Sequence, residues 1–198
     1  MAWYELHKKA DSLTKREYLQ VTDQRQYITA KTRDLQAVFA NGILPGKQYR
    51  LVTEKNFSAL VALEYFLEKY DVCEMHLAIY RMNYPAVLRL KEIAASGLPL
   101  NIIVSSFFRE NKKYEKWTRE LELFAKTADN VRLSFAWSHA KIFLCKTQTG
   151  EHFVFEGSGN LSDNARIEQY LVEDSREMFD FHKNWMDEIH RGAKGNDN

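Results

Sequence analysis

The segment Leu100–Ser105 (LNIIVS) places the strongest constraint on how this chain can fold. It is a near-continuous apolar run of strand length, and strands of this kind are buried on both faces of a parallel sheet. The preceding segment Tyr84–Ser96 has apolar residues at helical spacing and is stopped by Gly97 and Pro99. A helix that leads into a buried strand is typical of an α/β fold.

Strands and helices alternate along the chain from Gln48 onward. Short apolar or alternating segments predict strands at Gln48–Thr53, Glu74–Tyr80, Val131–Ala136, Lys141–Cys145 and Phe153–Glu156. Apolar residues at helical spacing predict further helices at Phe57–Tyr70, 112–127 and Ser175–His190. This order implies an α/β sandwich with a mixed, largely parallel sheet.

The last predicted helix, Ser175–His190, has an amphipathic pattern. Asp174 and Glu177 fit a start that resembles a capping box. Its inward face is expected to consist of Met178, Phe181, Trp185 and Ile189.

The first 47 residues are polar and weakly patterned. Asn41-Gly42 and Pro45-Gly46 mark the end of this region. We therefore expect an N-terminal extension at 1–47, serving as a dimer arm or a substrate-contacting element, and one domain at 48–198.

Composition narrows the class of protein. Apolar residues make up 45% of the 198 residues, which is enough for a sizeable core. The 28 basic and 27 acidic residues nearly cancel, which argues against a purely electrostatic nucleic-acid binder. The part of the chain before Asp163 carries the positive excess, so a polyanion should approach there.

Cys73 and Cys145 are expected to be buried free thiols, because the chain has neither a CxxC pair nor a cysteine framework. The N-terminus lacks the apolar core of a signal peptide, and the run 98–108 is too short and too polar to span a bilayer. The expected location is the cytoplasm, without a membrane partner.

Two short motifs concentrate residues suited to chemistry. His139 and Lys141 share one face of a strand, so an imidazole projects beside an ammonium group. Ser158 and Asn160 sit in a glycine-bracketed turn, where short polar side chains can approach a ligand closely. An anionic phosphoryl group suits this collection of a nucleophile, a fixed positive charge and neutral donors.

In these motifs the chain resembles the phospholipase D superfamily, whose half-site pattern (the HKD motif) is HxK, four residues, Asp, then G-[ST]-x-N. The match is HAK at 139–141 and GSGN at 157–160. Residues 76–105 resemble the strand–helix–strand unit before the motif, and 167–173 (IEQYLVE) resemble the strand after it. The resemblance covers about 48–190 and implies an α/β, phospholipase D-like α-β-α sandwich. One position departs from the pattern, because Lys146 stands where the family has Asp.

The resemblance also implies a mechanism. One histidine attacks phosphorus to give a phosphohistidine, and a second protonates the leaving oxygen. Lysine and asparagine stabilise the phosphoryl oxygens, and Glu168 orients the imidazole. The implied catalytic set is His139, Lys141, Ser158, Asn160 and Glu168. Neither a metal nor a cofactor is implied, and since the chain has one HxK unit, a homodimer would complete the centre.

Basic residues cluster around the predicted helix at 112–127. They are Arg109, Lys112, Lys113, Lys116 and Arg119, interleaved with Tyr114 and Trp117. This pattern fits a nucleic-acid track, and Arg109 and Lys112 are candidate substrate-binding residues together with Gly157 and Gly159. Three interspersed glutamates make an ordinary solvated helix face an equal alternative.

These observations favour a metal-independent phosphodiesterase that cleaves nucleic acid, an endonuclease acting as a homodimer. One alternative within the same fold is a phospholipid hydrolase or transphosphatidylase. Another is a catalytically degenerate nucleic-acid-binding module, an interpretation that Lys146 keeps open. His152 lies near the motif in sequence, but a surface-loop histidine is favoured over a second catalytic one.

Overall fold

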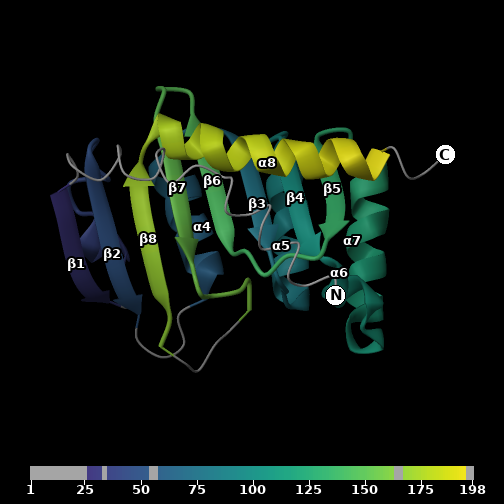
Figure 1. Cartoon of the computed structure of the whole chain (residues 1–198). Coiled ribbons are helices and arrows are strands. Elements are labelled where there is room, and N and C mark those ends of the chain that lie inside the picture. The colour runs from purple at the N-terminus through teal and green to yellow at the C-terminus, as the bar shows by residue number, and fades with distance from the viewer. Residues whose placement is uncertain (1–25, 33–34, 54–57, 163–166, 195–198) are drawn as a thin grey trace, which may run out of the picture.

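The computed structural model describes residues 26–32, 35–53, 58–162 and 167–194, which surround one eight-stranded sheet (Figure 1). The strands are β1 (Gln26–Thr32), β2 (Lys47–Thr53), β3 (Val72–Ile79), β4 (Leu100–Ser105), β5 (Val131–Ala136), β6 (Ile142–Thr147), β7 (His152–Gly157) and β8 (Gln169–Asp174). The described helices are α3 (Leu35–Val38), α4 (Ala59–Lys69), α5 (Tyr84–Ala95), α6 (Ser106–Glu110), the 3₁₀ helix η1 (Lys112–Tyr114), α7 (Glu115–Thr127) and α8 (Arg176–Lys194). The predicted strands at 100–105 and 131–136 are confirmed to the residue, while the expected helix start at Phe57 lies outside the described residues.

The strand order is β1-β2-β8-β7-β6-β3-β4-β5. The pairs β1–β2, β3–β4 and β4–β5 are parallel, and the other four pairs are antiparallel. The expectation of a largely parallel sheet is therefore wrong, although the sheet is mixed. The physical reason is local: β6 and β7 are joined by a short turn at 148–151 instead of a helix, and a turn of this length can only join antiparallel strands.

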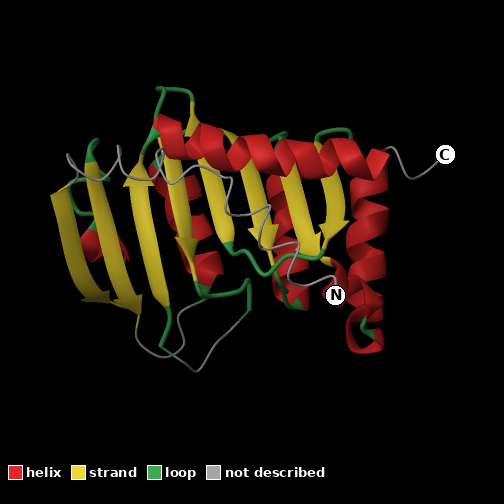
Figure 2. Ribbon diagram, viewed as in Figure 1, coloured by secondary structure: helices red, strands yellow, loops and turns green. Residues whose placement is uncertain are grey.

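Helices lie against both faces of the sheet. Figure 2 shows α8 crossing the front of the strands, with α4, α5 and α7 behind them. The larger hydrophobic core lies on the α4, α5 and α7 side and includes Phe66, Leu90 and Leu121. A smaller core joins α8 to the opposite face through Phe179 and Met186.

The strand–helix–strand unit at 72–105 forms as its sequence predicts. Asn83 caps α5, because its side-chain oxygen accepts a hydrogen bond from the backbone N–H of Ala86 at 3.0 Å, and Pro85 lies in the first turn. Gly97 ends the helix with a φ of 91°, a conformation that glycine adopts without strain. β4 then runs through the middle of the parallel part of the sheet and is buried along most of its length.

α8 begins differently from the expectation. The hydroxyl oxygen of Ser175 accepts a hydrogen bond from the backbone N–H of Met178 at 3.3 Å. The Asp174 side chain instead accepts from the backbone N–H of His152 at 2.9 Å, so it ties α8 to the start of β7. Ser175 is therefore the residue that caps α8.

The face that α8 turns to the sheet also differs. Phe179 and Met186 are 2% and 1% exposed, whereas Phe181 is 52% exposed. The expected inward position of Phe181 is wrong, because two residues on a helix turn a side chain by about 200°. The other three residues of the expected inward face, Met178, Trp185 and Ile189, flank the contact and are half-buried.

Part of the expected N-terminal extension belongs to this sheet. β1 forms an edge strand parallel to β2, and Leu35 of α3 is buried in the larger core. Residues 1–25, for which an arm is expected, lie outside the described residues.

Cys145 is fully buried on β6, and burial raises the pKa of its thiol to about 12. Cys73 is half-buried, and both cysteines are free. Among the described residues, every helix is too short or too polar to cross a membrane.

Candidate active site

His139 and Lys141 lie where the chain crosses one end of the sheet. Residues 137–141 run from the end of β5, along the carboxyl edge of β4 and β3, to the start of β6 (Figure 1). The Nζ atom of Lys141 donates to the backbone oxygen of His139 at 2.7 Å and lies 2.9 Å from its Nδ1 atom. His139 is exposed while Lys141 is buried, so the lysine contacts the histidine from the protein interior.

The ammonium group of Lys141 is held in a partly desolvated place. Burial, as the largest cause, lowers the pKa of Lys141 below its ordinary value. The negative charge of Glu168 opposes this shift, and the positive charge of Arg81 adds to it. A cation with little water around it interacts strongly with an incoming anion.

The connection from β7 to β8 brings Ser158 and Glu168 together. The hydroxyl of Ser158 donates to the Glu168 carboxylate and accepts from the backbone N–H of Gln169 at 3.0 Å. The backbone of Glu168 is bonded to Thr53 at the end of β2, which fixes the buried glutamate in place. Ser158 is thus oriented by a carboxylate that is itself anchored to the sheet.

Asn160 joins this connection to the end of β3. Its side-chain oxygen accepts from the backbone N–H of Arg81 at 3.1 Å. Next to it, Leu161 is bridged to Met82, and its carbonyl accepts from Asn83 at 2.9 Å. The amide nitrogen of Asn160 is the group that can donate to a substrate oxygen.

Gly157 and Gly159 allow close packing against Tyr170. A Cβ atom on Gly157 would lie 2.2 Å from the backbone oxygen of Gln169 and 2.4 Å from the Tyr170 ring. A Cβ atom on Gly159 would lie 1.8 Å from the Tyr170 hydroxyl. Glycine is therefore needed at both positions for the loop to approach the site.

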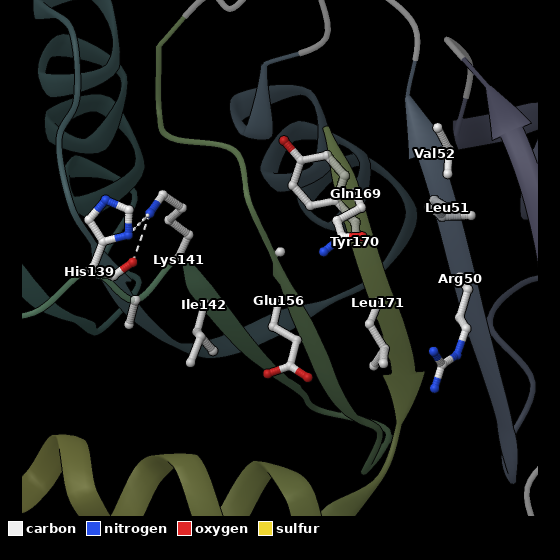
Figure 3. Close-up of a pocket in the computed structure, with 12 residues that line it drawn as sticks. Arg50, Leu51, Val52, His139, Lys141, Ile142, Glu156, Gln169, Tyr170 and Leu171 are labelled. Atoms are coloured by element: carbon white, nitrogen blue, oxygen red, sulfur yellow. Dashed lines mark hydrogen bonds between the residues drawn. The ribbon is translucent and has the colours of Figure 1, made fainter. Parts of the chain in front are cut away.

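A cavity of about 840 Å³ extends from His139 across the open part of the sheet face (Figure 3). The figure shows His139 and Lys141 at one end, Arg50 at the other, and Glu156 between them. Val52 and Leu171 add apolar surface to the same wall. The cavity offers a length of surface beside the imidazole with positive groups at both ends.

Lys146, which stands where the family motif has aspartate, lies away from His139. Lys146 lies near the far end of β6, opposite Glu74 of β3 and His152 of β7. Its charge helps to hold the pKa of Glu74 low, with the hydrogen bond to His76 as the largest cause. A carboxylate is thus present beside this position, but it comes from the neighbouring strand.

Of the five histidines in the described residues, His139 alone is exposed. His152 lies at the start of β7, five residues and about 17 Å of strand from Gly157. Its ring contacts that of Phe179, with centroids 5.1 Å apart, under α8. His152 is therefore far from the cavity end that His139 occupies.

Arg109 and Lys112 occupy another part of the molecule. Arg109 pairs with Glu122 at 3.0 Å, lies over the Phe135 ring and lines a second cavity of about 980 Å³. Lys112 is exposed on η1. Their role in substrate binding remains a prediction, as does the pairing of Glu168 with the His139 imidazole.

Sequence reasoning missed two residues that follow β3. The ring of Tyr80 lies 4.3 Å from that of His139, measured between centroids, and Lys141 Nζ lies 5.4 Å from the Tyr80 centroid. Arg81 contacts Asn160 and acts on the charge of Lys141. Their position at the end of a predicted central strand was the available signal, because ligands bind at the carboxyl edge of such strands.

The arrangement can support phosphoryl chemistry. The imidazole is exposed and can act as a nucleophile or a proton donor, and the lysine can neutralise a phosphoryl oxygen. Within the described ranges, no group of three His, Cys, Asp or Glu side chains is placed to hold a metal ion.

Solved structures share this arrangement of strands and helices. They include a phospholipase D family member, so this chain shares the fold of that protein, and the predicted resemblance is confirmed at the level of the fold. One is NucT from Helicobacter pylori, with 18% identity and a TM-score of 0.51 over 72% of this chain and 95% of that chain. Another is Nuc from Salmonella typhimurium, with 13% identity and a TM-score of 0.53 over 72% of this chain and 93% of that chain.

Two larger proteins also match. Polyphosphate kinase from Porphyromonas gingivalis has 17% identity and a TM-score of 0.56 over 84% of this chain and 28% of that chain. TrmBL2, an archaeal chromatin protein described as showing a novel mode of DNA binding, has 18% identity and a TM-score of 0.50 over 96% and 64%. No family model and no curated protein sequence matches the chain.

Proposed function

We propose that this protein is a phosphodiesterase that cleaves nucleic acid through a phosphohistidine intermediate, without a metal ion. The observation that carries the proposal is the contact of Lys141 Nζ with an exposed His139 ring at the mouth of a cavity. The imidazole supplies the nucleophile and the ammonium group supplies charge neutralisation, which are the two roles a metal plays in other phosphodiesterases.

The proton positions suggest how one histidine type fills two roles. A protonated lysine only donates, so His139 Nδ1 accepts from Lys141, and the neutral ring carries its proton on Nε2. Protonation of Nδ1 converts this ring into the imidazolium form, which is the form that acts as general acid. The nucleophile needs the opposite tautomer, with a proton on Nδ1 and a lone pair on Nε2, and a carboxylate such as Glu168 would stabilise it.

A homodimer would supply both states at once. In the first step, Nε2 of one neutral His139 forms a bond to phosphorus while the bond to the leaving oxygen breaks, and the imidazolium ring of His139 in a second subunit gives that oxygen its proton and becomes neutral. In the second step, the neutral ring of the second subunit takes a proton from water, and the water oxygen forms a bond to phosphorus while the bond between phosphorus and Nε2 of the first His139 breaks. Atoms and charge balance without a further reactant.

Nucleic acid is the substrate that the surroundings of the site favour. Arg81 beside Lys141 and Arg50 at the far end of the cavity suit a polyanion longer than a single phosphate. The DNA binding described for the structural neighbour TrmBL2 supports the same choice.

The decisive test is incubation of the purified protein with plasmid, single-stranded DNA and RNA in millimolar EDTA. We expect cleavage to persist, because imidazole and lysine take the place of the metal. Activity that vanishes in EDTA and returns with magnesium would refute the mechanism. Turnover of liposomes instead of nucleic acid would favour a phospholipid hydrolase or transphosphatidylase.

Substitution of the motif residues tests the same proposal. His139→Ala should reduce turnover by several orders of magnitude while the fold is retained, with His152→Ala as the matched control that stays active. Lys141→Ala and Asn160→Ala should each lower activity roughly 10²–10³-fold, the effect of removing one preorganised donor. Wild-type activity in folded His139→Ala protein would mean that the motif is coincidental.

A second candidate is a nucleic-acid-binding module that does not cleave. Lys146 in place of the motif aspartate favours it, as does the match to TrmBL2 over 96% of this chain. Tight binding of an oligonucleotide without cleavage, in wild type and His139→Ala alike, would establish this alternative.

A further inference from the structure

Three aromatic residues stand at the ends of three neighbouring parallel strands. β3, β4 and β5 run in one direction, so their carboxyl ends share one edge of the sheet (Figure 1). Tyr80 follows β3, Phe107 lies in α6 directly after β4, and Trp137 follows β5. The segment that carries His139 crosses the same edge, so the aromatic residues and the candidate active site are neighbours.

Two of these residues are open to solvent. Phe107 is 39% exposed and Trp137 is 74% exposed, whereas the adjacent Phe108 is fully buried. A single exposed aromatic residue is ordinary on a protein surface, but aromatic side chains gathered beside a site are typical of a binding surface. Trp137 is two residues from His139, so their Cα atoms lie within about 7 Å of each other.

The rings continue the surface of the His139 imidazole. Tyr80 is stacked on Phe107 with ring centroids 5.5 Å apart and an interplanar angle of 13°. The Tyr80 ring also lies 4.3 Å from that of His139, measured between centroids. The rings of Phe107, Tyr80 and His139 therefore form a continuous row that ends at the candidate nucleophile.

Positive charge accompanies this row. Arg81 follows Tyr80 directly, is exposed, and has its backbone fixed by Asn160. Lys141 Nζ lies 5.4 Å from the centroid of the Tyr80 ring. Flat rings beside fixed cations are the combination that binds a strand with exposed bases, because the rings stack on bases while the cations contact phosphates.

We propose that the exposed rings of Phe107 and Trp137 form a stacking platform for unpaired bases, with Tyr80 packed against Phe107 and His139, and that the substrate is single-stranded nucleic acid. In a duplex both faces of each base are covered by neighbouring pairs, so these rings could not reach them. This inference rests on the proposed nuclease function. It adds the class of substrate and the residues that select it.

Binding can be measured separately from cleavage through tryptophan fluorescence. Of the tryptophans in the described residues, Trp137 is exposed while Trp117 and Trp185 are half-buried. Titration with single-stranded oligo-dT should quench the fluorescence of Trp137. This quenching should be absent in the Trp137→Leu protein. A hairpin duplex of equal length should quench much less.

Cleavage kinetics give the second measurement. Phe107→Ala and Trp137→Leu should each raise KM for a single-stranded oligonucleotide roughly 5- to 100-fold, with kcat changed little, because one base–ring stack is lost. Phe181→Ala is the matched control, since Phe181 is an exposed aromatic residue on α8 and should leave KM unchanged.

The outcomes separate this inference from the proposed function. Equal quenching by duplex and single strand, or an unchanged KM in both variants, would overturn the platform while leaving the nuclease intact. Conversion of a wild-type dimer to a monomer by Trp137→Leu, seen by light scattering, would also overturn it and assign the rings to a subunit contact. Quenching by the single strand alone, without any cleavage, would contradict the proposed nuclease function but support the stacking platform.

Discussion

Lys141 combines a buried position with a charge that the proposed chemistry requires. It is 6% exposed, and its Nζ atom is hydrogen bonded to the backbone and ring of His139. Desolvation favours the neutral amine, while the carboxylate of Glu168 favours the ammonium form. The balance between these two effects decides the pH range in which the site can bind a phosphoryl group.

The first prediction concerns this pH range. The pKa of Lys141 is lowered, so its charge and the value of kcat/KM should be lost at a lower pH than for an ordinary lysine. Glu168→Gln removes the charge that raises this pKa and should move the alkaline limb of the pH profile further toward neutrality. Arg81→Gln removes a charge that lowers it and should move the limb the other way.

A matched control is available in the same cavity. Glu156 lines the same cavity as Lys141, whereas the charges that shift the pKa of Lys141 are those of Glu168 and Arg81. Glu156→Gln should leave the alkaline limb in place. An equal displacement in Glu156→Gln and Glu168→Gln would show that the limb reports general charge at the site and not Lys141.

At the scale of elements, the turn from β7 toward β8 is the feature on which the site depends. It places Ser158 against Glu168 and Asn160 against the end of β3. Both contacts need the chain to pass within contact distance of Tyr170, whose ring is packed on Phe155 with centroids 4.7 Å apart.

The second prediction concerns the glycines of this turn. Gly157→Ala should destabilise the protein by about 1–3 kcal/mol or more, because the added methyl group meets the backbone oxygen of Gln169, which cannot move without breaking the sheet. Gly159→Ala should cost less, because it meets the end of the Tyr170 side chain. Tyr170→Phe should recover part of that loss in a double-mutant cycle.

Urea denaturation measures these changes, and Gly192→Ala is the matched control. Gly192 lies in α8 with nothing within 4 Å of an added Cβ, so alanine should stabilise the helix by roughly 0.5–1 kcal/mol. A Gly157→Ala protein as stable as wild type would show that the β7–β8 pairing can shift to admit a side chain.

α8 shows why an amphipathic pattern does not fix the orientation of a helix. Its apolar residues form a stripe about 160° wide, so either edge or the middle of the stripe could be turned inward. The sheet selects Phe179 and Met186, seven residues apart, because their side chains fit against Ile142, Leu144 and Val154. Phe181 is left in solvent.

At the scale of the whole molecule, the third prediction concerns assembly. One chain offers one exposed histidine in the described residues, and the proposed displacement needs a nucleophile and a separate acid. If wild type and His139→Ala are refolded together in varying proportion, subunits pair at random. Activity should then fall as the square of the wild-type fraction, because active dimers need two wild-type chains.

Independent sites would instead give a straight line against the wild-type fraction. A mixture of wild type with His152→Ala is the control, and it should keep its activity at every proportion because His152 lies at the other end of β7. Cleavage by a protein that light scattering shows to be a monomer would rule out the shared site.

The sequence by itself determined the local elements and pointed to the candidate reactive residues. Leu100–Ser105 is a buried strand because four of its six residues are apolar. The Asn83 cap and the Gly97 stop act within a few residues of the helix that they delimit. His139 and Lys141 meet because they are two residues apart.

Only the tertiary structure decided the strand order and the groups that come to the site from a distance. Tyr80 and Arg81 lie next to residues 59 to 79 positions away because β6 pairs with β3. Glu168 reaches Ser158 because β8 returns between β2 and β7. Local patterns depend on neighbours within one or two turns, so they are visible in sequence. Pairings between distant strands depend on how all the apolar faces are buried together, a property of the whole chain.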